Sequence, residues 1–144
     1  VEGWHDRVGA ILQPFYAGME GGTALARLLF GDVSPSGRLP FTLARDAADY
    51  PPFDRDAKAI RYGYWHGYQL FDHEWKEPRY RFGHGLSYAR FSYRALKLRV
   101  ADDAVHVSVA VRNDGAMAAD EVVQLYVGCP GLAAERPLKS LRAF

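Results

Sequence analysis

The N-terminal region carries a short apolar run followed by a helical pattern of apolar positions. The run Val8–Leu12 has the length and composition of a buried β-strand. A glycine-rich turn over 18–22 separates it from Thr23–Phe30, where three leucines fall on one helical face and Gly31 follows as a stop signal. We expect the helix to begin at Thr23 or one or two residues earlier. Strand, turn and helix in this order predict an α/β layer.

The C-terminal region changes to the two-residue period of β-strands. Residues 91–100 predict one strand, and 104–112 alternate clearly, with a valine at every second position from Val105 to Val111. Asn113–Gly115 predicts a turn, and Glu121–Val127 predicts another strand. Short strands at this spacing are typical of a β-sandwich, which needs about seven strands. Because only three or four are visible, we expect the sandwich to be incomplete.

The region between them, from Asp32 to Tyr88, is predicted to be mostly irregular. Proline and glycine recur there in turn-forming strings. Much of the aromatic content, which is 14% of the chain, lies between Tyr50 and Tyr93. A long irregular segment of this kind is usually functional or packed against another domain. His84 stands between two glycines, which predicts a positive φ or the close approach of another segment.

Composition and charge limit the partners and cofactors that we expect. The chain has 144 residues, a net charge of +1 and scattered basic residues, so we expect neither nucleic acid nor an anionic membrane surface as partner. The sequence has no run of about 18 apolar residues, so we predict no membrane-spanning helix. Cys129 is the single cysteine, the five histidines lack metal-ligand spacing, and no phosphate-binding loop is present. We therefore predict no metal and no cofactor. The compartment stays open, with a periplasmic or extracellular location slightly favoured over a cytoplasmic one.

Four groups of residues follow one another in a consistent order. They are Ala10–Leu12 with Tyr16–Gly22 and Leu29–Asp32; Pro35–Pro40 with Asp49–Pro51; Phe82–Tyr88; and Asn113–Gly115 with Asp120–Val127 and Arg136–Lys139. Together they span nearly the whole chain and resemble glycoside hydrolase family 3, the β-glucosidase and β-xylosidase group.

This resemblance implies a three-part retaining enzyme. Its first domain is a barrel that carries an Asp nucleophile, its second an α/β sandwich that carries a Glu acid/base, and its third a fibronectin type III-like sandwich. The chain would then be an α+β fragment: residues 1–45 end the α/β sandwich, 46–88 form an aromatic-rich linker, and 89–144 begin an incomplete fibronectin-like domain. The barrel and the α/β domain upstream would be its partners, and a carbohydrate the substrate of the parent enzyme.

No catalytic residue is predicted in this chain. A retaining glycosidase needs two carboxyl groups about 5–5.5 Å apart, and the acidic residues here lie singly among turns. The chain alone is therefore expected to be inactive.

Three residues are candidates for the rim of a sugar pocket: Glu20, Trp65 and His66. Each has an alternative interpretation. Glu20 can satisfy N–H groups at a helix start, and the two aromatic side chains can fasten the linker to the upstream domain.

The alternative function for the whole chain is a non-catalytic, fibronectin-like binding or interaction module. It would need a complete set of strands and an independent fold.

Overall fold

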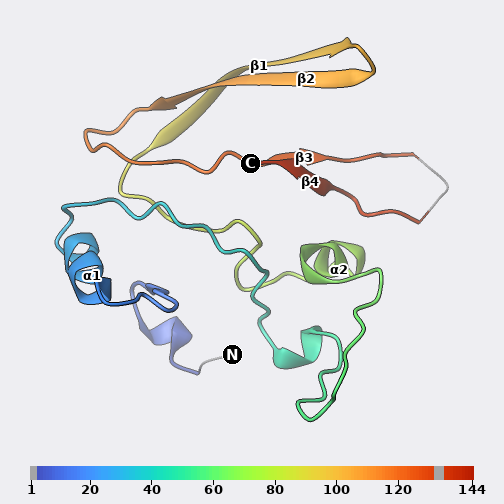
Figure 1. Cartoon of the computed structure of the whole chain (residues 1–144), viewed down its shortest axis with the longest axis horizontal. Helices are drawn as coiled ribbons and strands as arrows, with labels where there is room; N and C mark the ends of the chain where they lie inside the picture. The colour runs from blue at the N-terminus through green and yellow to red at the C-terminus, as the bar shows by residue number, and fades with distance from the viewer. Residues whose placement is uncertain (1–2, 132–134) are drawn as a thin grey trace. The chain divides into compact units, whose positions relative to one another are not determined.

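A computed structural model of the chain describes residues 3–131 and 135–144. In chain order its elements are η1 His5–Arg7, α1 Gly21–Leu29, η2 Ala47–Asp49, α2 Gly67–His73, β1 Phe91–Ala101, β2 Ala104–Asn113, β3 Leu125–Val127 and β4 Ser140–Ala143. Strand β1 pairs with β2 and β3 pairs with β4, both antiparallel (Figure 1). The described fold is thus α+β with two small antiparallel sheets. Within its described part, no helix has the length and hydropathy needed to cross a bilayer.

The chain divides into two compact units that alternate along the sequence. Unit 1 comprises Val1–Leu12, Gly37–Gly85 and Val122–Phe144, and unit 2 comprises Gln13–Ser36 and Leu86–Glu121. Unit 1 therefore contains α2 and the β3–β4 pair, and unit 2 contains α1 and the β1–β2 hairpin. Each unit is described by itself below.

The β1–β2 hairpin of unit 2 confirms the first two predicted strands of the C-terminal region. Its two-residue turn is Asp102–Asp103, and both residues have positive φ (52° and 58°), as a type I′ turn requires. A bulge lies between Arg94 and Lys97, with Ala95 at φ 52°.

The bulge keeps the apolar side chains of β1 on one face. Directly opposed residues of an antiparallel pair share a face, and the extra residue shifts the alternation of β1 by one position. The shared apolar face consists of Tyr93, Leu96, Leu98 and Val100 from β1 and Val105, Val107, Val109 and Val111 from β2. Leu98 (66% exposed) and Val100 (79% exposed) show that much of this face lies open in the chain as described.

Helix α1 of unit 2 confirms the predicted helix and begins two residues before Thr23. Gly31, at φ 80°, follows its end as predicted. The predicted strand at Val8–Leu12 is wrong: this segment of unit 1 has irregular backbone and is exposed. A strand needs a hydrogen-bonded neighbour, and neither sheet among residues 3–131 and 135–144 includes this run.

The core of unit 1 forms where the sequence predicted an irregular linker. Helix α2 begins at Gly67, directly after the extended His66, and buries Leu70 and Phe71. The Tyr50 hydroxyl accepts a hydrogen bond from the N–H of fully buried Ala44 (2.7 Å) and donates to the Thr42 carbonyl (3.0 Å). The Tyr50 ring also packs edge-on against Phe71. The prediction missed α2 because its seven residues start with Gly and include two aromatic residues, which are weak helix signals.

The glycines beside His84 behave as predicted. Gly83 has φ 79°, and a Cβ at this position would overlap the side-chain amide of Gln124. A Cβ at Gly85 would overlap the carbonyl oxygen of Gly37. The Leu39 N–H donates to the His84 carbonyl at 2.8 Å, so the two segments run in close contact. A side chain at Gly85 would force them apart, whereas one at Gly83 would displace the Gln124 side chain and be strained by the positive φ.

The predicted strand Glu121–Val127 forms only over its last three residues, as β3. Its partner β4 was not predicted, because its four residues fall in a short segment with no clear alternation. The two sheets of the described chain belong to different units. The incomplete sandwich therefore stays a prediction, as does the division at residues 45 and 88.

Candidate functional site

An aromatic cluster in unit 1 joins α2 to the β3–β4 pair. The Tyr68 ring lies 5.2 Å from the Phe82 ring and 5.8 Å from the Tyr126 ring, centre to centre, with the two tyrosines edge-to-face. The Tyr68 hydroxyl accepts a hydrogen bond from the backbone N–H of Leu141 at 2.9 Å. The Gln69 side-chain amide donates to the Ser140 hydroxyl at 3.4 Å. Helix α2 is thereby fixed to β4.

A pocket of about 350 Å³ opens beside this cluster, and we call it the α2 pocket. Its lining comes from four stretches of unit 1: Thr42, 68–82, 124–126 and 138–139. It combines aromatic rings with charged and amide side chains: Thr42, Tyr68, Phe71, Asp72, Trp75, Lys76, Glu77, Pro78, Arg81, Phe82, Gln124, Tyr126, Leu138 and Lys139. A concave site of this size and mixture has the character of a small-molecule pocket.

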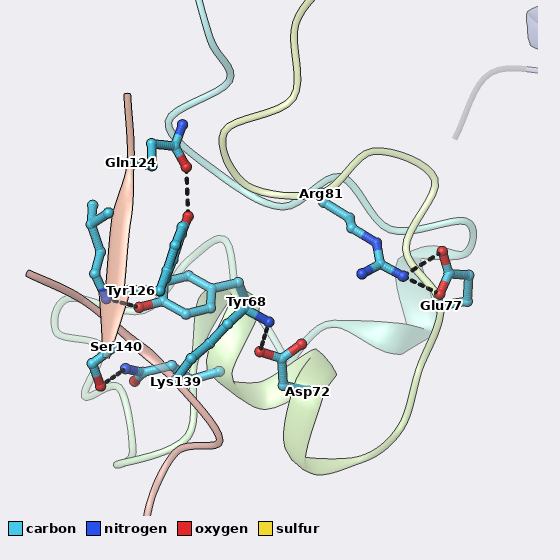
Figure 2. Close-up of polar contacts among 10 residues, drawn as sticks. Tyr68, Asp72, Glu77, Arg81, Gln124, Tyr126, Lys139 and Ser140 are labelled. Carbon is cyan, nitrogen blue, oxygen red and sulfur yellow. Dashed lines mark hydrogen bonds and ion pairs between the residues drawn. The ribbon is translucent and has the colours of Figure 1, made fainter. Parts of the chain in front are cut away.

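Each cation of the α2 pocket has a carboxylate partner. Lys139 Nζ lies 2.6 Å from Asp72, and one nitrogen of Arg81 contacts both carboxylate oxygens of Glu77 at 2.8 and 3.1 Å (Figure 2). Lys76 contacts Glu74 at 2.8 Å, and this hydrogen bond raises the pKa of the ammonium group. The pocket therefore presents donors and acceptors with its charges already compensated.

Tyr126 is a hydrogen-bond donor within the pocket wall. Its hydroxyl donates to the side-chain oxygen of Gln124 at 2.6 Å (Figure 2). Burial raises the pKa of Tyr126, and the nearby Tyr68 and Asp72 add to the rise. The phenol is therefore protonated at neutral pH, and its contact leaves the Gln124 amide nitrogen available at the lining.

Trp75 occupies an unusual backbone position at the end of α2. Its φ is +54°, and the following Lys76 N–H donates to the Phe71 carbonyl at 3.0 Å, which closes a Schellman cap. Glycine is the usual residue at this left-handed position. The indole is nevertheless 83% exposed and contributes to the α2 pocket.

Thr42 also lines the α2 pocket, but its hydroxyl oxygen is buried. The residue is only 4% exposed, and its hydroxyl has no hydrogen-bond partner among the described residues. A buried hydroxyl without a partner costs about 1–3 kcal/mol.

The structure places Trp65 and His66 next to each other but outside the lining of the α2 pocket. The Trp65 ring stacks on His73, with 4.1 Å between ring centres and 4° between planes. Its indole N–H donates to Glu135 at 3.3 Å. His66 is exposed and precedes α2, and its Nδ1 lies 3.2 Å from the Gly63 carbonyl. These contacts hold both rings within unit 1.

Glu20 lies in unit 2, as the exposed residue before α1. Its side chain makes no capping hydrogen bond, so the helix-start interpretation lacks its expected contact. Trp65 and His66 are neighbours already in the sequence, and Glu20 lies in the other unit. Their role at a sugar pocket stays a prediction.

The sequence pointed to the aromatic region but not to the α2 pocket. The density of rings between Tyr50 and Tyr93 was the available signal. The pocket depends on Tyr126 and Lys139, which only the β3–β4 pairing brings to α2. No group of three or more His, Cys, Asp or Glu side chains suited to a metal ion occurs within 3–131 and 135–144.

Comparison with known proteins gives consistent matches along the chain. The profile of the glycosyl hydrolase family 3 C-terminal domain matches residues 1–88. The chain is 42% identical to a β-glucosidase of Rhizobium radiobacter over 98% of its own length and 19% of that protein. It is 39% identical to thermostable β-glucosidase B of Acetivibrio thermocellus, again over 98% of the chain and 20% of the relative.

Solved structures match in the same way. β-Glucosidase 3B of Thermotoga neapolitana, in complex with α-D-glucose, superposes with a TM-score of 0.88 at 33% identity, over 97% of this chain and 21% of that one. The Kluyveromyces marxianus β-glucosidase gives a TM-score of 0.88 at 32% identity, over 97% and 18%. The chain therefore spans about a fifth of the length of the proteins it matches.

Proposed function

Because this chain belongs to glycosyl hydrolase family 3, we propose that it forms the C-terminal part of a retaining β-glycosidase of the β-glucosidase or β-xylosidase type. The observation that carries the proposal is the shared backbone, with a TM-score of 0.88 over 97% of the chain against a β-glucosidase at 33% identity. The substrates proposed for the whole enzyme are β-linked glucosides or oligosaccharides.

We further propose that the nucleophile and the acid/base lie outside this chain. The carboxylates around α2 are engaged in structural contacts, since Asp72 and Glu77 each hold a cation and Asp46 caps η2. Retaining hydrolysis needs two carboxyl groups about 5–5.5 Å apart across the scissile bond, one free to exchange a proton. The chain alone is therefore inactive, and the barrel and α/β domains of the parent enzyme are its partners.

Exposed apolar side chains support such partners. In unit 2, Tyr16 and Met19 are fully exposed and Phe30 is 86% exposed. Large apolar side chains left in water favour burial against another surface, at roughly 25 cal/mol for each Å² covered. We propose that the remainder of the enzyme covers them.

The finer architecture is part of the same proposal. Residues 1–45 close the α/β sandwich domain, 46–88 link the domains, and 89–144 contribute strands to a fibronectin type III-like sandwich. The amphipathic β1–β2 hairpin, with apolar residues on one face, supports this assignment because a sandwich sheet has one such face. Glu20, Trp65 and His66 are proposed to lie at the rim of the parent's sugar pocket.

The stand-alone fibronectin-like module is the weaker alternative. Residues from Ala89 onward depend on upstream partners within both units. In unit 1 Lys139 pairs with Asp72 and the Leu141 N–H donates to Tyr68. In unit 2 the segment entering β1 is held by Tyr88, which donates to the Leu28 carbonyl and to Ser34. A module cut at residue 89 would lose these contacts.

The test is to express the full-length gene product and the 144-residue chain separately and to assay both with 4-nitrophenyl β-D-glucoside. We expect hydrolysis with retention by the gene product and no turnover above buffer by the chain. Circular dichroism confirms that the chain is folded in the assay. Turnover by the chain alone would refute the assignment of catalytic groups to another part. A gene product inactive on β-glucosides and β-xylosides would refute the proposed activity.

A further inference from the structure

We propose that the α2 pocket is a non-catalytic binding site for a neutral pyranose sugar. Its walls offer flat apolar rings beside hydrogen-bonding groups whose charges are already compensated. A sugar ring presents that combination, because its C–H faces are apolar and its rim carries hydroxyls.

Trp75 supplies the flat surface. Glycine adopts this positive φ without strain, whereas in other residues it raises the backbone energy. Because the indole is 83% exposed, its packing within the described chain offsets little of that strain. A ligand that stacks on the indole would give this strained residue a function.

The charge pattern selects an uncharged ligand. An anion would meet the carboxylates of Asp72 and Glu77, and a cation would meet Lys76, Arg81 and Lys139. The two carboxylates pair with Lys139 and Arg81 (Figure 2). Lys76 is compensated by Glu74, which lies outside the lining. A hydroxyl both donates and accepts, so it can join either pair without breaking it.

The size of the pocket agrees with this ligand class. The volume of about 350 Å³ lies at the lower end of the range for small-molecule sites, which suits one or two sugar rings.

The test uses the full-length gene product labelled with 5-fluorotryptophan, with D-glucose as the probe. The ¹⁹F resonance of Trp75 is assigned by its loss in Trp75→Gly, because glycine suits the positive φ at this position. We expect the Trp75 resonance to shift saturably with D-glucose and not with inorganic phosphate at the same concentration.

The site-specific signal separates this proposal from the catalytic one. A Trp75 resonance that does not respond to glucose, in protein that hydrolyses 4-nitrophenyl β-D-glucoside, would overturn the sugar site and leave the proposed function intact. A Trp75 resonance shielded from a soluble paramagnetic agent would mean that another part of the polypeptide covers the indole, and would also overturn it. A saturable shift in protein without glucosidase activity would support the site and refute only the activity.

Discussion

Replacing Tyr50 with Phe tests the core of unit 1 by removing a single oxygen atom. That oxygen accepts the N–H of Ala44 at 2.7 Å and donates to the carbonyl of Thr42 at 3.0 Å. Its two partner groups belong to buried residues, since Ala44 is fully buried and Thr42 is 4% exposed, while Tyr50 itself is 38% exposed. The ring remains in place against Phe71, and the substitution therefore isolates the two hydrogen bonds.

The expected cost of Tyr50→Phe is about 2 kcal/mol, because a buried group left without its partner loses about 1–3 kcal/mol. This corresponds to about a thirtyfold larger opening constant for the segment. Hydrogen-exchange mass spectrometry of peptides covering Ala44 measures it, since exchange reports local opening. We expect the Ala44 amide to exchange about thirtyfold faster than in the unsubstituted protein.

Tyr16→Phe is the matched control, because Tyr16 is fully exposed and its substitution should leave exchange at Ala44 unchanged. An Ala44 amide that exchanges at the same rate in Tyr50→Phe and in the control would show that the hydroxyl does not support the core, and the hydrogen-bond argument would fail.

Three further predictions concern a glycine, a carboxylate and a turn. Gly83→Ala should destabilise the chain by about 1–3 kcal/mol in denaturant unfolding, because alanine is strained at φ 79° and its Cβ would also displace the Gln124 side chain; Gly9→Ala, with open space around it, should be near neutral. Hydrogen bonds from the neighbouring imidazole and guanidinium lower the pKa of Asp6 below its ordinary 3.8, so its stabilising effect is present above that pH and is lost as the pH falls below it. Asp6→Asn should therefore flatten the acid limb of a stability–pH curve, and an unchanged limb would contradict the cause given. Asp103→Gly should slow amide exchange in the hairpin about two- to fivefold, since glycine adopts the second position of a type I′ turn more easily; faster exchange would count against that turn type.

Local alternation and glycine geometry were predictable from the sequence. The valines of β2 and the leucines of α1 repeat with the period of their element, so each element was visible without its neighbours. The close approach at Gly83 and Gly85 was predictable because the absent side chains themselves were the signal. The bulge at Ala95 was not predictable, since it shows only when β1 is aligned with β2.

Features that depend on distant partners were missed or wrongly assigned. The apolar run Val8–Leu12 satisfies the local rule for a strand but has no hydrogen-bonded neighbour in either sheet. Strand β4 and helix α2 are too short to be recognised alone, and each is stabilised by the other through Tyr68 and Leu141. The α2 pocket follows the same rule, because no local pattern places Lys139 beside Asp72.

Because the two units alternate along the sequence, unit 1 cannot finish folding until the end of the chain has been translated. Unit 1 is completed only by Val122–Phe144, although its helix α2 is translated some fifty residues earlier, and the Asp72–Lys139 pair closes a loop of 67 residues. Until β4 has been translated, the Tyr68 hydroxyl and the Asp72 carboxylate remain hydrated, because their partners Leu141 and Lys139 are not yet present. A premature stop or a protease cut after about residue 120 would consequently remove one wall of the α2 pocket and leave the β1–β2 hairpin whole.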